Sequence, residues 1–182
     1  MLNALINFLG FQSVWFLSLF GAGTHRSWLG AIALVAFTVW HFRSVANPRA
    51  EIVIVLIACA VGFVVDTAFI QANLLAYAEP LPFAAVAPYW ILGMWVNFAL
   101  TLNGSMRWLH GRYLLAAALG AIGGPLAYVA GIRLGAAELL ASGVVVYGVL
   151  AVVWALAVPL LVLATERVNQ RWPPAAGAVV TG

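Results

Sequence analysis

Long runs of apolar residues alternate with short polar segments along the whole chain. Six runs are long enough, or nearly so, to cross a bilayer, for which about 20 mostly apolar residues suffice. The pattern therefore predicts an all-α integral membrane bundle of six transmembrane helices. The expected helices span residues 2–20, 28–42, 51–75, 88–106, 113–131 and 139–164.

The breaks between these runs are short and contain strong turn residues. Asn47-Pro48 and Glu79-Pro80-Leu81-Pro82 interrupt the pattern, because proline disfavours a helical conformation in the residue before it. No connecting segment is long enough to form a soluble domain. We therefore expect one membrane domain over residues 1–182, with a short cytoplasmic tail at 165–182.

The composition supports the membrane class. Hydrophobic residues make up 65% of the 182 residues and charged residues 7%, and the mean hydropathy is +1.07. A soluble domain is nearer to a quarter charged. The eight basic residues are all arginines and form no block, so nucleic acid is not an expected partner. The single cysteine, Cys59, and the scattered histidines lack metal-ligand spacing, so we expect neither a metal nor a cofactor.

The placement of the arginines predicts the orientation of the helices. Six arginines fall on one side of the six-helix arrangement, and only Arg26 and Arg133 fall on the other. Because basic residues are concentrated on the cytoplasmic side of such proteins, both termini are expected in the cytoplasm. The six arginines are Arg43, Arg49, Arg107, Arg112, Arg167 and Arg171.

The fourth run carries a polar stripe. Asn97, Thr101 and Ser105 recur every four residues and therefore share one helical face. Lipid offers no hydrogen-bond partner to these side chains, so the stripe is expected to face other helices. We interpret it as the polar seam of the bundle.

Asp66 is the only carboxylate well inside a predicted span. A charge there costs at least about 2.5–3.5 kcal/mol unless it is paired or hydrated, so Asp66 is expected to face protein. Two interpretations remain open: a proton or substrate site, or a structural acid bonded to an arginine or to asparagine amides. Arg133, at the outer end of the fifth helix, is the expected ion-pair partner. The predicted polar cluster is Asp66, Asn97, Thr101, Tyr128 and Arg133.

The fifth run is rich in glycine and contains one proline. Gly120 with Gly124, and Gly131 with Gly135, form two pairs of small residues four apart, which is typical of close helix packing. Pro125 lies in the middle of the run, where it removes a backbone donor and disturbs the carbonyl of the preceding turn. The expected kink is either architectural or opens a ligand pocket.

Specific segments along the chain carry a family resemblance. They are Asn7-Phe8, Phe11-Gln12, Trp15-Phe16, Gly21-Ala22-Gly23, Arg49-x-Glu51, Asp66, Pro88-x-Trp90, Trp95, Phe98-Ala99-x-Thr101-Leu102-Asn103, Ser105, Trp108-Leu109, Gly123-Gly124-Pro125-Leu126-Ala127-Tyr128, Arg133-Leu134-Gly135-Ala136 and Pro159-Leu160-Leu161. On these residues the chain resembles the bacterial inner-membrane family catalogued as domain of unknown function twenty-eight seventy-eight, over nearly its whole length. That family carries no assigned reaction. An association of its genes with lipid-modifying genes, such as cyclopropane-fatty-acid-synthase-like ones, implies a role near lipid modification and identifies no catalytic residue.

We therefore expect a multipass protein of the bacterial inner membrane that acts in lipid or fatty-acid modification as an accessory or partner-binding subunit. Its expected partners are membrane lipids, together with another membrane protein or a second copy of the chain. The absence of any cavity would favour this interpretation.

Two alternatives remain open. A small-molecule or lipid transporter would use Asp66 and the polar stripe to line its path, and helices broken at Pro125 and Pro159 would favour it. A lipid-acting intramembrane enzyme would use Asp66, Tyr128 and Arg133, and a lipid pocket beside Asp66 would favour it.

Overall fold

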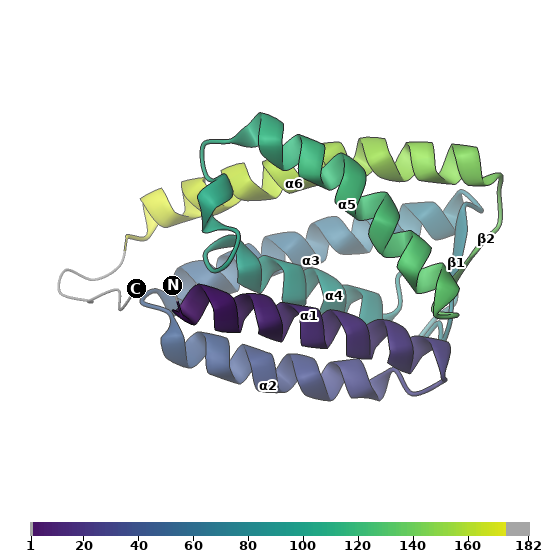
Figure 1. Cartoon of the computed structure of the whole chain (residues 1–182), viewed down its shortest axis with the longest axis horizontal. Coiled ribbons are helices and arrows are strands. Elements are labelled where there is room, and N and C mark those ends of the chain that lie inside the picture. Colours follow the sequence, from purple (N-terminus) through teal and green to yellow (C-terminus); the bar gives the residue numbers. More distant parts are fainter. Residues whose placement is uncertain (1, 174–182) are drawn as a thin grey trace.

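The computed structural model describes residues 2–173, and these form six α-helices and one short two-stranded ribbon (Figure 1). The elements are α1 (Leu2–Gly23), α2 (Trp28–Ser44), α3 (Pro48–Gln71), β1 (Leu75–Tyr77), α4 (Tyr89–Leu102), the 3-10 turn η1 (Arg107–Leu109), α5 (Tyr113–Arg133), β2 (Ala137–Leu139) and α6 (Gly143–Arg171). The architecture is therefore all-α in its main elements, as the apolar pattern predicts.

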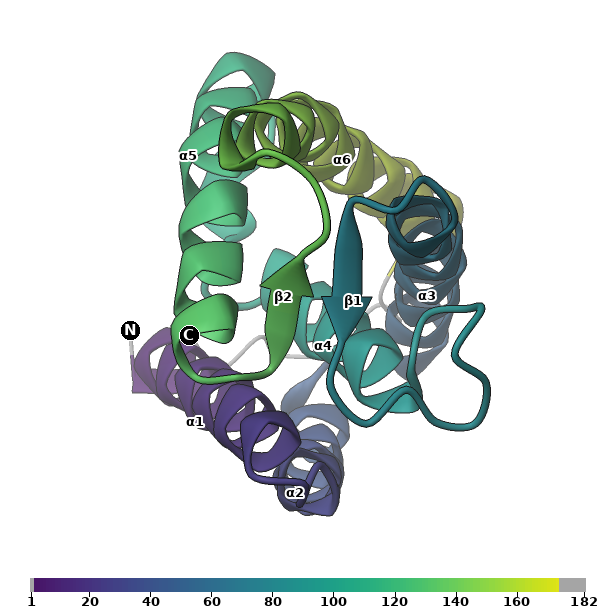
Figure 2. The same cartoon turned by 90° about the vertical axis from the view of Figure 1, so that its right-hand side faces the viewer.

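Four of the helices are long and apolar enough to cross a membrane, namely α1, α3, α5 and α6. The other two are shorter, with 17 residues in α2 and 14 in α4. At 1.5 Å per residue, α4 is about 21 Å long, which is less than the roughly 30 Å hydrocarbon core of a bilayer. The helices thus divide into four candidate spans and two shorter helices, of which α4 is mostly buried and α2 packs at the edge of the bundle against α1 and α4 (Figure 2).

The outward faces of the long helices are apolar. The exposed fraction reaches 89% for Leu114 on α5 and 86% for Val144 on α6, and Leu56 on α3 and Leu5 on α1 are also exposed. A continuous apolar exterior of this kind is unfavourable in water and suits contact with lipid. The surface and the helix lengths together indicate a membrane protein.

Helix α4 ends four residues earlier than predicted. The chain turns at Gly104, where an added Cβ would lie 2.5 Å from the side chain of Asn7 on α1. Asn7 Oδ1 then accepts hydrogen bonds from the backbone N of Ser105 at 2.9 Å and from its hydroxyl at 2.8 Å. Ser105 therefore lies in the turn after α4, because bonds to another helix replace the bonds that would extend this one.

Helix α6 is displaced toward the C-terminus relative to the prediction of 139–164. Residues 137–139 form β2, and the expected tail from Thr165 continues as helix to Arg171. Thr165 is buried and its hydroxyl donates to the carbonyl of Leu161 at 2.8 Å, while Asn169 bonds to Asn103 at 2.8 Å. These polar residues find partners inside the bundle, so the helix persists. The remainder of the expected tail, 174–182, lies outside the described residues.

The helices pack largely as neighbours along the chain, with α1 against α2, α3 against α4 and α5 against α6. Figure 2 shows the ribbon of β1 and β2 crossing the end of the bundle between these helices. The two strands are antiparallel and pair Leu75 with Leu139. The sequence does not predict this ribbon, because each strand has only three residues.

Glycines let α5 pack tightly against α6. A Cβ on Gly120 would lie 2.1 Å from the backbone oxygen of Trp154, and one on Gly124 would lie 2.3 Å from the ring of the same residue. The helix continues through Pro125 without a break. Gly135 lies beyond the end of α5 with a φ of 75°, so it forms the turn into β2 and is not part of a helix face.

Helix α5 crosses the bundle obliquely and approaches α1 only at the ribbon end (Figure 1). There, Gly131 lies next to Leu19, and a Cβ on Gly23 would lie 1.8 Å from the backbone oxygen of Leu134. Toward the other end of the bundle the two helices diverge (Figure 1). Their divergence leaves the space in which the candidate site lies.

Candidate functional site

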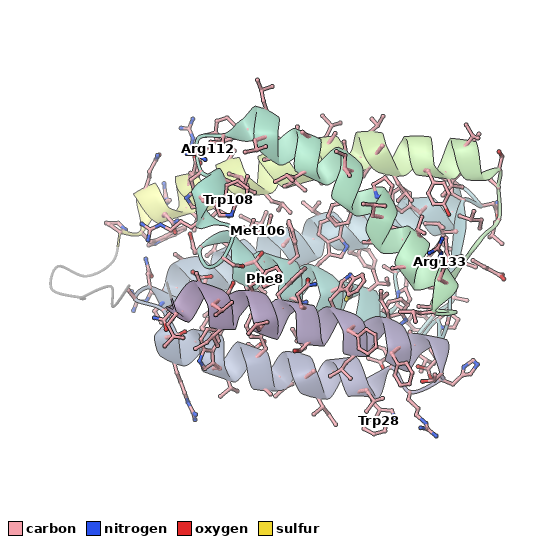
Figure 3. All side chains as sticks on the ribbon, in the orientation of Figure 1. Phe8, Trp28, Met106, Trp108, Arg112 and Arg133 are labelled. Carbon is pink, nitrogen blue, oxygen red and sulfur yellow. The ribbon has the colours of Figure 1, made fainter. Side chains whose placement is uncertain are left out.

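A cleft of about 570 Å³ lies between α1 and α5, with α4 and α6 behind it. Figure 3 shows Phe8, Met106 and Trp108 toward the wider end of this cleft, where α1 and α5 diverge. Most of the side chains that line it are apolar or aromatic. They include Phe11, Trp15, Phe98, Leu119 and Leu126.

Asp66 lies on α3 at the opposite, narrow end of the cleft and is fully buried. Three side chains from three other elements donate hydrogen bonds to its carboxylate. Tyr77 of β1 and Tyr128 of α5 both donate to Oδ1, the latter at 2.8 Å, and the indole N–H of Trp95 on α4 donates to Oδ2 at 2.6 Å. All three donors are neutral side chains, so within residues 2–173 the carboxylate has hydrogen-bond partners but no charged partner.

Local packing positions these donors. Gly62 precedes Asp66 by one helical turn, and a Cβ there would lie 2.2 Å from the ring of Trp95, so only glycine lets the indole lie against α3. The ribbon places Tyr77 over the end of α3, and its ring meets Trp90 edge to face with centroids 5.9 Å apart. Burial, and then the neighbouring Asp66, raise the pKa of the Tyr77 hydroxyl well above its usual value, so it remains a donor.

A layer of stacked aromatic rings forms the floor of the cleft. Trp95 stacks on Trp154 of α6, with centroids 4.9 Å apart and an interplanar angle of 10°. Phe98 meets Trp154 edge to face with centroids 6.0 Å apart, and Phe69, which does not line the cleft, meets Tyr128 in the same way at 6.2 Å. The cleft therefore combines an apolar length with one carboxylate in an aromatic surround.

The sequence matches one family over most of its length. That family is described as a protein of unknown function (DUF2878), and the match covers residues 4–160. The chain belongs to this family. The resemblance inferred from the sequence is thus confirmed. No curated protein matches the chain, and no solved structure does.

Two of the five residues predicted to form a polar cluster are in direct contact, namely Asp66 and Tyr128. Thr101 lines the same cleft, and its hydroxyl donates to the carbonyl of Phe98 at 2.6 Å. Asn97 does not line the cleft. Its amide instead donates to the carbonyl of Phe11 at 3.1 Å and joins α4 to α1.

The expected ion pair between Asp66 and Arg133 is wrong. Among residues 2–173, no ion pair joins Asp66 to any arginine. Arg133 is exposed at the end of α5 (Figure 3), past the turn that carries Tyr128. Neutral side chains donate to the carboxylate in place of an arginine, and the guanidinium at a helix end is able to stay in a polar environment.

Two residues of the site, Tyr77 and Trp95, are not among those predicted from the sequence. Tyr77 falls in a segment that resembles a linker, because a three-residue strand has no recognisable period. The position of Trp95 in the sequence could have indicated its role. Tryptophan in membrane proteins is enriched at the interfaces, so an indole in the middle of an apolar run implies an internal acceptor for its N–H.

A second polar centre, also missed, lies at the opposite end of the bundle. His41 and Glu51 are both buried and form an ion pair at 3.2 Å if the histidine is protonated. His41 also contacts the amide of Asn7, and Glu51 accepts a hydrogen bond from Asn103 at 2.8 Å. The network joins α1, α2, α3 and the turn after α4, beside a polar pocket of about 670 Å³. Within the described chain, no group of three or more His, Cys, Asp or Glu side chains is placed to hold a metal ion.

Proposed function

We propose that this protein binds the apolar chain of a lipid, or of a lipid-like molecule, in the cleft between α1 and α5. The observation that carries the proposal is the cleft itself, which is elongated, apolar and bounded by helices long enough to span a bilayer. Ligand pockets typically measure about 300–1,000 Å³, so a cavity of about 570 Å³ is of a suitable size for one chain.

The position of the cleft indicates how such a chain enters. Phe8 on α1 and Leu126 on α5 both line it, and their exposed fractions are 49% and 61%. Side chains that are exposed on these helices face lipid when the protein is in a bilayer. A chain is therefore able to move sideways from the lipid into the cleft, without passing through a polar entrance.

The proposal includes a topology. All six helices cross the bacterial inner membrane, including the shorter α2 and α4, and both termini lie in the cytoplasm. Its support is the excess of arginines at the end of the bundle where α1 begins and α6 ends. In this orientation, Asp66 lies in the outer half of the membrane and the wide end of the cleft in the inner half.

The cleft also changes the role that we assign within lipid or fatty-acid modification. A purely partner-binding subunit needs no cavity, so we propose a subunit that itself holds the lipid, with a membrane protein or a second copy of the chain as its partner. The transporter alternative lacks the support of broken helices, since α5 and α6 run on through Pro125 and Pro159. The enzyme alternative lacks Arg133, which does not line the cleft.

The test is to block the cleft. Gly123 lines it, is exposed, and has nothing within 4 Å of an added Cβ, so Gly123→Trp fills the cleft without displacing backbone. Gly148 on α6 is also exposed and open, and it does not line the cleft, so Gly148→Trp is a matched control.

Both variants are to be labelled with a photoreactive fatty alcohol in lipid nanodiscs, and the labelled peptides mapped by mass spectrometry. We expect labelling of the cleft-facing parts of α1 and α5 in the unaltered protein and in Gly148→Trp, and its loss in Gly123→Trp. Equal labelling of the two variants at these positions would contradict the proposal.

A further inference from the structure

We propose that the narrow end of the cleft binds the positively charged ammonium group of an amphiphile whose apolar chain lies along the cleft. This inference rests on the proposed function, because it names the chemical class of the molecule that the same cleft holds. Its support is a buried carboxylate without a balancing cation, surrounded by aromatic rings, at one end of an apolar cleft.

The carboxylate of Asp66 has hydrogen-bond donors but no balancing positive charge. Tyr77 and Tyr128 donate to Oδ1 and Trp95 donates to Oδ2, and all three are neutral. In the part of the chain that the structure describes, the single ion pair lies at the opposite end of the bundle. Buried charges are normally paired, and Oδ2, which accepts one bond, has capacity for another donor. A cationic ligand supplies both the missing charge and the missing donor.

Aromatic rings surround this carboxylate on several sides. Trp95 and Trp154 form a stacked pair, and Tyr77 lies edge to face against Trp90. All of these rings, together with Tyr128, line the cleft near Asp66. The faces of indole and phenol rings attract ammonium groups, and the attraction is largest where water is excluded. A carboxylate binds an ammonium group through its charge and the surrounding rings bind it through their faces, so the two together suit an ammonium ligand.

The shape of the cleft gives the ligand an orientation. Asp66 lies five residues before Gln71 at the end of α3, which corresponds to about 7.5 Å along the helix. From there the cleft follows α1 from Leu19 to Phe8, a rise of about 16 Å. The ammonium group therefore lies under the β1–β2 ribbon, and the chain extends from it toward the wide end.

The charge of Asp66 discriminates against other end groups. A fatty acid would place a second carboxylate beside the first, and like charges at short range repel strongly. A neutral alcohol is able to donate one hydrogen bond but leaves the charge of Asp66 unbalanced. The site therefore prefers an amine-bearing chain to an alcohol or an acid of equal length.

The experiment compares three competitors that share one chain. The protein, in nanodiscs of phosphatidylglycerol, is labelled with the photoreactive fatty alcohol in the presence of octylammonium, octanol or octanoate. We expect octylammonium to halve the labelling at a concentration at least about tenfold lower than octanol, and octanoate to be the weakest. This comparison uses the unaltered protein, so it does not depend on any variant folding.

The three competitors partition differently into the membrane. Two variants therefore test whether the preference for octylammonium arises at Asp66 or from this partitioning. Asp66→Asn removes the charge while keeping the size of the side chain, and we expect it to abolish the preference for octylammonium over octanol. Glu51→Gln makes the same change in a buried carboxylate that does not line the cleft, and we expect it to leave the preference intact. A preference that survives Asp66→Asn would overturn the assignment to this site.

The remaining outcomes distinguish the two proposals. Equal competition by octylammonium and octanol in the unaltered protein would overturn the ammonium site and leave chain binding in place. If the fatty alcohol does not label the cleft at all, the proposed function itself fails.

The ammonium group has two possible sources, a lipid head group or a free amphiphilic amine. Adding phosphatidylethanolamine to the phosphatidylglycerol nanodiscs separates them. If the head group is the natural ligand, phosphatidylethanolamine reduces labelling in the unaltered protein and not in Asp66→Asn. If the ligand is a free amine, octylammonium competes and phosphatidylethanolamine does not.

Discussion

Asp66 lies within an apolar helix and is hydrogen-bonded by side chains from three other elements, Tyr77, Trp95 and Tyr128. The arrangement gives a carboxylate inside a membrane protein three hydrogen-bond donors, none of which is an arginine. Among the described residues no basic side chain lies beside Asp66, which distinguishes it from Glu51, whose carboxylate lies 3.2 Å from the ring of His41. On this difference rests our proposal that Asp66 is the site for an incoming cation, whereas Glu51 links helices through His41 and Asn103.

At the residue scale, the loss of Asp66 should cost far more stability than the loss of Arg133. Asp66→Ala removes the acceptor of three donors, of which Tyr77 and Trp95 are buried, and each unsatisfied buried donor costs about 1–3 kcal/mol. Arg133 is exposed and unpaired with Asp66, so Arg133→Ala should change the free energy of unfolding by less than about 0.5 kcal/mol. The measurement is thermal unfolding of each single variant and the double variant in detergent.

The two losses should add in the double variant, because the side chains do not interact. A double variant more stable than Asp66→Ala alone would indicate that the two residues are an ion pair after all.

At the scale of elements, the position of α5 decides where the cleft lies. The middle of this helix is held against α6 at Gly120 and Gly124, and its C-terminal end approaches α1 near Gly131. The helix therefore leans across the bundle, and the space beneath it becomes the cleft (Figure 1). The β1–β2 ribbon closes the narrow end and contributes Tyr77, so two elements of three residues each complete the site.

Because α5 packs closely on α6, a larger side chain should destabilise the bundle at the contact and have little effect away from it. Gly124→Leu forces a side chain into the ring of Trp154 and should destabilise the bundle by about 1–3 kcal/mol. Gly148→Leu, on an open face of α6, introduces the same side chain without a clash and should have little effect. Thermal unfolding in detergent compares them, and equal midpoints for the two variants would show that α5 does not approach α6 this closely.

At the scale of the whole molecule, polar interactions concentrate at the two ends of the bundle and apolar contacts fill its length. The Asn7, His41, Glu51 and Asn103 network ties four elements together at the end where α1 begins. The Asp66 cluster ties together α3, β1, α4 and α5 at the other. Each network is internal, as polar groups must be in a chain whose exterior faces lipid.

The distribution of arginines predicts that both termini lie in the cytoplasm. A reporter that is active only in the cytoplasm should be active when fused at Gly182, and a reporter active only in the periplasm should be silent there. Fusions at the N-terminus test the same side independently. A split between the two termini would show an odd number of crossings, and a periplasmic result at both would reverse the proposed orientation.

Local sequence determined those properties that depend on residues close together along the chain. The apolar runs specify six helices, because apolar side chains must leave water and a backbone in lipid must satisfy its own hydrogen bonds. The start of α3 is also local, since Pro48 is suited to a first turn and Asn47 caps the backbone N of Ala50 at 3.2 Å. Buried Asp66 and Tyr128 were recognisable as polar groups that need partners, and family membership followed from segments of matching sequence.

Only the tertiary structure decided which polar groups meet, and where the helices end. Just after α4 ends at Leu102, Ser105 bonds to Asn7, which is 98 residues away in sequence, and the three-residue strands β1 and β2 form only because they pair with each other. Tyr77 reaches Asp66 through that ribbon, while Arg133 remains exposed on the same side of the bundle. The physical reason is that several partners are chemically acceptable to a buried carboxylate. The packing angle of α5 and the register of the ribbon select among them, and neither is encoded in any single stretch of the chain.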